Sequence, residues 1–273
     1  MSDLSGLGPI LLVGCGKMGG ALLEGWLARG LKREDCFIVE PSPDHPGRGL
    51  GVRDARDAAG IDPAFVPKVV LLAVKPQVME DAAPPLRRLV GSGTFVLSIA
   101  AGRTLASFER IFGADAAILR AMPNTPAAVG RGISVLVANK NASAQQRQAA
   151  ERLMAAVGAT GWVEDEGLID AVTGLSGSGP AYVFLLVEAM AEAGVRQGLP
   201  PDLAMRLARE TVAGAGELLH RSSEAASTLR KNVTSPKGTT QAALDVLMAE
   251  PGLGELMARA IEAATRRGRE LAK

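Results

Sequence analysis

Six residues near the start of the chain have the types and spacing of a dinucleotide-binding turn. They are Gly14, Cys15, Gly16, Lys17, Met18 and Gly19, a G-x-G-x-x-G pattern that directly follows the apolar run Pro9–Val13. In such a turn the first glycine permits a tight bend, the second lets the backbone approach a pyrophosphate, and the third lets helix and strand pack closely. The helix that follows offers N–H groups to the phosphates. An ordinary glycine-rich turn is the alternative, and the surrounding strand and helix patterns favour the dinucleotide site.

An acidic residue stands where this kind of site uses one. Glu40 ends the next apolar segment, about 20 positions after the glycines. An acid there accepts a hydrogen bond from a ribose 2′-hydroxyl and repels a 2′-phosphate. The first arginine after it is Arg48, so electrostatics favour NADH over NADPH. A solvent-facing glutamate at a strand end is the alternative, and the sequence does not separate the two.

Three more groups of residues each lie at the end of an apolar segment that we interpret as a strand. They are Ala73-Val74-Lys75-Pro76-Gln77, Ser98-Ile99-Ala100-Ala101-Gly102 and Met122-Pro123-Asn124-Thr125-Pro126. The carboxyl ends of parallel strands line the ligand crevice. We therefore expect the cofactor to contact Val74, Lys75, Pro76, Ala100 and Asn124. For Lys75 an ordinary exposed or paired lysine is favoured over a general acid or a Schiff-base lysine.

A hydroxyl-rich turn in the second half of the chain has the features of an anion-binding helix start. It contains Ser235, Pro236, Lys237, Gly238, Thr239 and Thr240. Hydroxyl and N–H groups that converge at the positive end of a helix can bind a small carboxylate without an arginine. A capped helix start without a ligand is the alternative.

The apolar pattern predicts the scaffold that positions these residues. The predicted strands are Pro9–Val13, Cys36–Glu40, Val69–Val74, Thr94–Ala100, Ala117–Met122, Ile133–Ala138 and Gly161–Glu164. The predicted helices between them are Met18–Ala28, Val78–Leu89 (interrupted by Pro84 and Pro85), Thr104–Phe112 and Ala144–Val157. Strands that are apolar throughout, with helices between them, indicate a mostly parallel sheet with helices on both faces.

Beyond Glu166 the pattern predicts helices alone. They are Pro180–Gln197, Pro201–His220, Ser223–Lys231, Thr240–Ala249 and Leu253–Leu271. We therefore predict a Rossmann-type dinucleotide-binding domain over residues 1–166 and an all-helical domain over 167–273. The second domain is small for helices of this length, so several of them should bury apolar faces against a second subunit.

Composition excludes several other classes of protein. Lys plus Arg (30) nearly balances Asp plus Glu (29), which leaves no broad positive surface for nucleic acid. Two cysteines are too few for a disulfide framework or a structural zinc site, and the presence of only two histidines argues against a histidine-based metal site. The longest apolar run, Ala181–Val187, is too short to cross a bilayer. We expect a cytoplasmic protein that binds small molecules, and no metal, membrane or nucleic acid.

In combination, these motifs resemble the pyrroline-5-carboxylate reductase family over nearly the whole chain. The likeness is carried by Gly14-x-Gly16-x-Met18-Gly19, Val74-Lys75-Pro76, Met122-Pro123-Asn124-Thr125-Pro126, Gly177-Ser178-Gly179-Pro180-Ala181-Tyr182 and Val233-Thr234-Ser235-Pro236. The resemblance implies a Rossmann domain and a helical dimerisation domain whose helices interleave with those of the partner. It also implies that dimers assemble into decamers.

One residue departs from the family pattern. The last motif of the family reads Ser-Pro-Gly-Gly-Thr-Thr, and here Lys237 replaces the first of those glycines. A left-handed backbone at this position would cost a lysine about 1 kcal/mol or more. Either the turn tolerates the side chain or substrate binding is altered. We expect tolerance, with Lys237 facing solvent.

The resemblance also implies a reaction. It is hydride transfer from NADPH or NADH to C5 of 1-pyrroline-5-carboxylate, which gives L-proline in the last step of proline biosynthesis. A protonated cyclic imine is already electrophilic, so positioning of the two reactants would supply most of the catalysis. The implied substrate-binding residues are Ser235, Gly238, Thr239 and Thr240. Of these, Thr240 is the catalytic candidate because it would hydrogen-bond the ring nitrogen.

Three other functions stay open. A β-hydroxyacid dehydrogenase would carry a lysine early in the helix after its glycines, and the helix after Gly179 begins Pro-Ala-Tyr-Val-Phe-Leu-Leu-Val-Glu without one. An imine reductase for another cyclic imine has no distinguishing spacing. In a non-catalytic dinucleotide-binding protein the substrate turn would be degraded, and Lys237 is the one sign of that.

Overall fold

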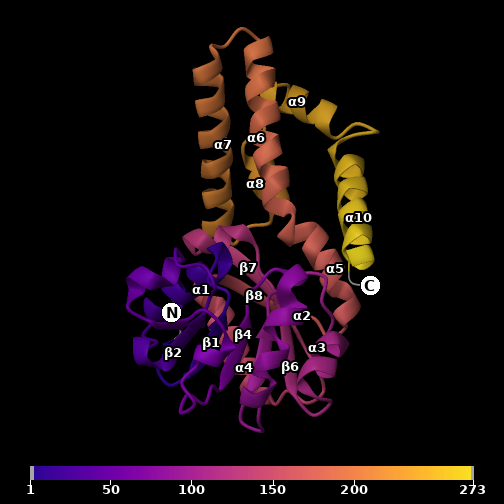
Figure 1. The fold of residues 1–273 in the computed structure, drawn as a ribbon. Coiled ribbons are helices and arrows are strands. Elements are labelled where there is room, and N and C mark those ends of the chain that lie inside the picture. The colour runs from indigo at the N-terminus through magenta and orange to yellow at the C-terminus, as the bar shows by residue number, and fades with distance from the viewer. Residues whose placement is uncertain (1–2, 272–273) are drawn as a thin grey trace. The chain divides into compact units, whose positions relative to one another are not determined.

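Two compact parts make up the computed structural model, which describes residues 3–271 (Figure 1). Within that range the first part contains residues 3–177 and 264–271, and the second contains residues 178–263. The sequence pattern places a domain boundary at 166/167 instead, because it follows the end of strand-like segments. Packing assigns residues 167–177 and the end of the last helix to the first part, where a Cβ on Gly268 would lie 3.1 Å from the Asp170 carboxylate.

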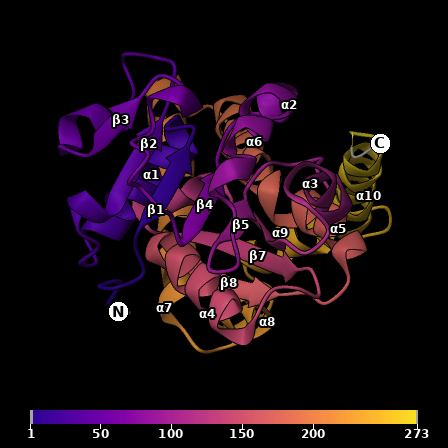
Figure 2. The same ribbon diagram turned by 60° about the horizontal axis from the view of Figure 1, so that its bottom comes forward.

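An eight-stranded sheet forms the centre of the first part, in the order β3-β2-β1-β4-β5-β6-β7-β8 (Figure 2). The strands are β1 (Ile10–Val13), β2 (Cys36–Val39), β3 (Arg53–Ala55), β4 (Val69–Leu72), β5 (Phe95–Ser98), β6 (Ala117–Met122), β7 (Gly132–Ala138) and β8 (Gly158–Trp162). Neighbouring strands are parallel except β6 and β7, which are antiparallel. The first six strands have the order of a Rossmann fold, so the predicted fold class is confirmed.

Helices cover both faces of this sheet, as predicted. The α-helices of the first part are α1 (Lys17–Leu27), α2 (Met79–Ala82), α3 (Leu105–Phe112), α4 (Ala144–Met154) and α5 (Ile169–Val172). Successive side chains of a strand point to opposite faces. Leu12 accordingly packs in one core with Trp26 of α1 and Leu153 of α4. Its neighbour Leu11 packs in the other core with Phe108 of α3.

Shorter turns of helix connect these elements. The 3-10 helices are Arg33–Asp35, Pro46–Leu50, Ala58–Gly60, Pro76–Val78, Pro84–Leu89, Thr125–Val129, Ala155–Val157 and Glu166–Leu168, and Thr173–Gly177 is a π-helix. The helix predicted over Val78–Leu89, with an interruption at Pro84 and Pro85, is divided into α2 and a 3-10 helix. The reason is that Pro84 and Pro85 lack the N–H groups that a continuous α-helix needs.

The sheet brings the candidate loops to one edge. Val13 of β1 lies opposite Leu72 of β4, and Leu72 lies opposite Ser98 of β5. On the other side, Val13 lies opposite Val39 of β2. Because these strands are parallel and in register, the residues that follow each of them emerge together at the carboxyl edge. This is the edge at which doubly wound sheets bind ligands.

The second part consists of helices, as predicted. It contains α6 (Gly179–Arg196), α7 (Pro201–Arg221), α8 (Ala226–Asn232) and α9 (Thr239–Leu247), and α10 (Leu253–Leu271) begins in it. Helices α6 and α7 form an antiparallel pair (Figure 1). Small residues allow a close contact between them, since a Cβ on Gly194 would lie 3.3 Å from the Cβ of Ala204. Among the described residues no helix is apolar and long enough to cross a bilayer.

Large apolar side chains of the second part are exposed in the single chain. Phe184 and Leu185 of α6 are each 63% exposed, and Leu218 of α7 is 68% exposed. The buried residues of α6 and α7 are the alanines Ala191, Ala204 and Ala208. A hairpin that buries only alanines gains little from the hydrophobic effect, so its larger side chains need another surface.

Cys36 at the start of β2 should make the protein less stable as the pH rises in the alkaline range. Burial raises the pKa of its thiol from 9.0 to about 12, with a further contribution from Asp35 and Glu34. The unfolded thiol ionises near 9.0 while the folded thiol stays protonated, so the free energy of unfolding should fall between these values. Urea unfolding at several pH values measures the slope. Cys36→Ala should reduce the slope of the unfolding free energy against pH by up to about 1.4 kcal/mol per pH unit. Equal slopes in the two proteins would contradict the assignment of this pH dependence to Cys36.

Candidate functional site

The three glycines of the turn after β1 have different structural roles. Gly14 has φ +90°, and a Cβ there would lie 2.9 Å from the carbonyl group of Ala73. A Cβ on Gly19 would lie 2.2 Å from the Gly14 carbonyl oxygen. Gly16 is exposed, and a Cβ on it would meet no protein atom within 4 Å. The first and third glycines are thus required by the protein itself, whereas the second faces open space in which a ligand can approach the backbone.

Helix α1 presents its amino end to this open space. It begins at Lys17, and its N-cap Gly16 provides no side-chain hydrogen bond to the first turn. The first N–H groups of a helix have no partner within the helix, so they are available to an anion. Lys17 is exposed beside them, while Met18 is half-buried against the core. These residues fit the pyrophosphate of a dinucleotide.

Glu40 is tied to the glycine turn. Its Oε2 accepts a hydrogen bond of 2.8 Å from the Cys15 backbone N–H, and its Oε1 accepts one of 3.0 Å from Ser42 N–H. The side chain is half-buried. Glu40 therefore differs from a glutamate that simply faces solvent, because it links the end of β2 to the turn after β1. Its carboxylate oxygens retain lone pairs for a further donor.

Cys15 packs inside the turn as a small apolar residue. Its side chain is fully buried, and a Cβ on Gly47 would lie 3.0 Å from its Sγ. Burial raises the pKa of the Cys15 thiol, and the nearby Glu40 and Glu24 carboxylates raise it further. A protonated, buried thiol is a poor nucleophile.

The loops after β4 and β5 are joined by an arginine. The Arg103 guanidinium donates to the Pro76 carbonyl oxygen at 2.9 Å and pairs with Glu80. Lys75 is exposed before Pro76, and the neighbouring Val74 side chain lies 2.9 Å from the position of a Cβ on Gly14. The predicted cofactor residues after β4 thus lie next to the glycine turn.

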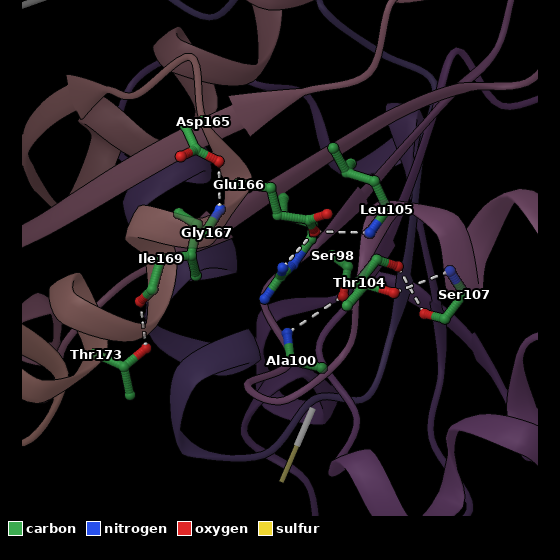
Figure 3. Close-up of polar contacts among 11 residues, drawn as sticks. Ser98, Ala100, Thr104, Leu105, Ser107, Asp165, Glu166, Gly167, Ile169 and Thr173 are labelled. Atoms are coloured by element: carbon green, nitrogen blue, oxygen red, sulfur yellow. Dashed lines mark hydrogen bonds and ion pairs between the residues drawn. The ribbon is translucent and has the colours of Figure 1, made fainter. Parts of the chain in front are cut away.

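A second polar cluster supports the loop after β5 (Figure 3). The Ser98 hydroxyl accepts a hydrogen bond of 3.2 Å from Ala100 N–H, which shapes the loop at its start. At its end, the Thr104 side chain accepts a hydrogen bond of 3.1 Å from Ser107 N–H and so caps α3. The predicted cofactor residue Ala100 is therefore buried in a loop that is held at both ends.

Glu166 connects this loop to the sheet (Figure 3). One of its oxygens accepts a hydrogen bond of 2.7 Å from Leu105 N–H, and the same oxygen pairs with Arg120 of β6. The Arg120 side chain is only 7% exposed. Sequence reasoning marked Glu166 only as the end of the strand-like region and assigned Arg120 no role. The signal was absent because the two residues are 46 positions apart and neither belongs to a local motif.

Asn124 after β6 makes two hydrogen bonds within the protein. Its Oδ1 accepts from Ile133 N–H at 2.9 Å, and its Nδ2 donates to the Ser176 carbonyl oxygen at 3.2 Å. Ser176 belongs to the π-helix Thr173–Gly177, a type of turn that is frequent at functional sites. The Asn124 side chain therefore links β7 and the π-helix, and it keeps one amide hydrogen and further acceptor capacity for a ligand.

The predicted substrate residues lie at the start of α9. Gly238 is the N-cap, and its N–H donates to the Ser235 carbonyl oxygen at 3.0 Å. A Cβ on Gly238 would lie 2.6 Å from the Ser235 hydroxyl oxygen, so a larger residue there would force the Ser235 side chain to move. Gly238 offers no side-chain cap, which leaves the first N–H groups of α9 available. Thr239 is exposed and Thr240 is half-buried.

The structure thus assembles the predicted residues into two groups. Those expected to bind the cofactor, namely Gly14, Gly16, Lys17, Met18, Gly19, Glu40, Val74, Lys75, Pro76, Ala100 and Asn124, all belong to the first part of the chain. Ser235, Gly238, Thr239 and Thr240, which are expected to bind the substrate, belong to the second part. No cluster of three or more histidine, cysteine, aspartate or glutamate side chains suited to a metal ion occurs among residues 3–271.

Lys237 adopts the left-handed conformation that a glycine would favour. Its φ is 60°, and it is the one non-glycine residue with a positive φ in the described part of the chain. Its side chain is exposed, as expected. The turn therefore accommodates a lysine at the cost of local backbone strain.

Lys237→Gly should stabilise the protein by about 1 kcal/mol, because glycine adopts positive φ without the Cβ clash. The larger conformational freedom of an unfolded glycine reduces the gain. Chemical unfolding measures the difference. As a control, Lys231→Gly within helix α8 should destabilise by about 1 kcal/mol. A Lys237→Gly protein that is no more stable than the wild type would show that the strain relieved at this residue does not exceed the entropy cost of an added glycine.

The fold and the two groups of residues define a Rossmann-type, NAD(P)-dependent oxidoreductase with a C-terminal helical domain. Residues 9–102 match the family described as NADP oxidoreductase, coenzyme F420-dependent, and residues 166–271 match the one described as pyrroline-5-carboxylate reductase dimerisation. The chain belongs to the pyrroline-5-carboxylate reductase family, which confirms the resemblance found in the sequence.

Full-length relatives establish this membership. The chain is 39% identical over 271 residues to the pyrroline-5-carboxylate reductase of Pseudomonas aeruginosa, and the match covers 97% of each chain. It is 41% identical over 265 residues to the enzyme of Synechocystis sp., covering 93% of this chain and 96% of the relative.

Solved structures agree over the whole chain. A pyrroline-5-carboxylate reductase from Coxiella burnetii superposes with a TM-score of 0.90 at 36% identity and covers 98% of this chain and 99% of that one. The pyrroline carboxylate reductase of Plasmodium falciparum, solved with NADP bound, has a TM-score of 0.82 at 26% identity and covers 100% of both chains.

Proposed function

We propose that this protein reduces 1-pyrroline-5-carboxylate to L-proline with NADH or NADPH, as the last step of proline biosynthesis. The observation that carries the proposal is the full-length match to reductases of this name, in a chain that retains an open glycine turn at Gly16. The hydroxyl-rich start of α9 supplies a second element, a binding site for a small carboxylate.

The first part of the chain would hold the cofactor. The backbone of Gly14, Gly16 and Gly19 and the amino end of α1, with Lys17 and Met18, bind the pyrophosphate, and Glu40 accepts a hydrogen bond from the adenosine ribose. Val74, Lys75, Pro76, Ala100 and Asn124 hold the nicotinamide side. When bound, the reduced nicotinamide supplies the hydride.

The start of α9 would hold the substrate. The Ser235 hydroxyl and the N–H groups of Gly238 and Thr239 bind the carboxylate, and the Thr240 hydroxyl accepts a hydrogen bond from the protonated ring nitrogen. A cyclic iminium needs no strong acid for reduction at its carbon atom. The protein's contribution is then to hold both reactants in one orientation and to exclude water.

We propose a homodimer formed through the helical part, with interleaved helices and with dimers that assemble into decamers. The family description of residues 166–271 as a dimerisation region supports this, together with the exposed apolar side chains of α6 and α7. Light scattering coupled to size-exclusion chromatography tests it: a monomer at micromolar concentration would overturn the proposal. The substrate and cofactor are soluble metabolites, and we place the protein in the cytoplasm.

The decisive experiment is an assay with purified protein, 1-pyrroline-5-carboxylate and each reduced nicotinamide cofactor. Loss of nicotinamide absorbance should be accompanied by an equal amount of L-proline, measured by amino-acid analysis. If the protein reduces cyclic imines of another ring size but not 1-pyrroline-5-carboxylate, it is a different imine reductase. Tight cofactor binding without turnover of any imine would identify a non-catalytic dinucleotide-binding protein.

A further inference from the structure

The position of the Glu40 carboxylate is determined by the backbone of two loops. Oε2 is bonded to Cys15 N–H at 2.8 Å and Oε1 to Ser42 N–H at 3.0 Å. Cys15 cannot move away, because it is fully buried inside the glycine turn. Hydrogen bonds from N–H groups to a carboxylate are charge-assisted and short, so they hold the group firmly. The carboxylate is therefore held at a fixed place in this loop.

This charge lies where the adenosine ribose must be. Gly14 N–H donates to the Val39 carbonyl oxygen at 2.8 Å, so the glycine turn and the end of β2 are in contact. A dinucleotide with its pyrophosphate on the amino end of α1 places its adenosine ribose beside the end of β2. A 2′-hydroxyl can donate to the Glu40 carboxylate, whereas a 2′-phosphate brings a second anion close to it.

We propose that Glu40 makes this protein selective for NADH over NADPH. The proposal rests on the proposed dinucleotide site and goes beyond it by naming the cofactor. It concerns this chain rather than the family, since the Plasmodium falciparum relative was solved with NADP bound.

The surrounding charges do not remove this preference. In the same loop, Asp44 is exposed and adds negative charge, and the Arg48 guanidinium donates to the Pro43 carbonyl oxygen at 2.7 Å. His45 is buried and lies 3.2 Å from Asp54. The cation that requires a test is Arg56, which is exposed and follows Ala55, whose carbonyl oxygen accepts from Glu40 N–H at 3.0 Å.

Binding of two nicotinamide-free ligands tests the proposal without turnover. ADP-ribose and its 2′-phosphorylated form are titrated into the wild-type protein by calorimetry. We expect ADP-ribose to bind at least about tenfold more tightly. Added salt should narrow that ratio, because the repulsion that produces it is screened.

Two variants test whether Glu40 is the cause of the affinity ratio between the two ligands. Glu40→Gln keeps an acceptor oxygen and removes the charge, so it should tighten binding of the 2′-phosphorylated ligand by about tenfold and change binding of ADP-ribose far less. Arg56→Ala is the matched control at the same edge and should leave the ratio unchanged. Thermal unfolding verifies that both variants fold.

The outcomes separate this proposal from the proposed function. Equal or tighter binding of the 2′-phosphorylated ligand by the wild type overturns the selectivity and leaves the reductase activity intact. An unchanged ratio in Glu40→Gln, or a selective loss of that ligand in Arg56→Ala, also overturns it. If neither ligand binds, the dinucleotide site is absent, and the proposed function fails together with the selectivity.

Discussion

Gly16→Ala should weaken the binding of NADH and NADPH by about 100-fold and leave the fold intact. The new methyl group would meet no protein atom within 4 Å, and the φ of this residue is −73°, a value that alanine adopts readily. The free energy of unfolding should fall by less than about 1 kcal/mol, the usual effect of alanine at an N-cap. The methyl group would instead occupy the space through which a pyrophosphate approaches the backbone. Steric crowding by one methyl group costs about 1–3 kcal/mol of binding free energy. The upper end of this range corresponds to a loss of affinity of about 100-fold.

Gly19→Ala is the matched variant with the opposite expectation. Its methyl group would lie 2.2 Å from the Gly14 carbonyl oxygen, and that backbone cannot move away because Gly14 lies against Ala73, directly after β4. We expect a loss of more than about 3 kcal/mol of stability. Fluorescence titration with NADH and thermal unfolding distinguish the two variants. Wild-type affinity in Gly16→Ala would mean that the nucleotide does not lie on this turn.

Thr240→Ala should lower kcat/KM for 1-pyrroline-5-carboxylate by about 10–100-fold. The hydroxyl lost in this variant is the group proposed to form a hydrogen bond with the ring nitrogen. Loss of one or two polar contacts in a binding site lowers kcat/KM by about this factor. Thr240 is the second residue of α9 and is half-buried, so the substitution leaves the helix start in place.

Two further measurements make the Thr240 result specific. Thr240→Ser keeps the hydroxyl and should retain kcat/KM within a few-fold, and the affinity of the alanine variant for NADH should equal that of the wild type. Unchanged kinetics in Thr240→Ala would remove this residue from the mechanism. A parallel loss of cofactor affinity would point to a structural defect instead.

Local patterns in the sequence were sufficient for most of the scaffold. The apolar strands predicted from their composition are all present, with ends shifted by at most three residues. The short β3 was not predicted because its residues Arg53 and Asp54 are charged and exposed, as an edge strand permits. The glycine turn was found because its function depends on spacing within six residues, which a linear pattern records.

Spacing also placed the substrate turn, yet it could not determine the backbone conformation within it. Only the three-dimensional turn shows that Lys237 takes a φ of 60°. Whether a lysine suits that position depends on the conformation and not on the residue type.

The contacts that shape the site were decided by tertiary structure. Glu166 lies 61 residues from Leu105 and 46 from Arg120, and Asn124 lies 52 from Ser176. No local pattern encodes such pairs, because each side chain meets its partner only after the sheet has formed and the strand-end loops have gathered at one edge. Glu40 shows the same dependence. The sequence alone predicted its position at the end of a strand. Its hydrogen bond to Cys15 forms only because parallel pairing brings β1 and β2 together.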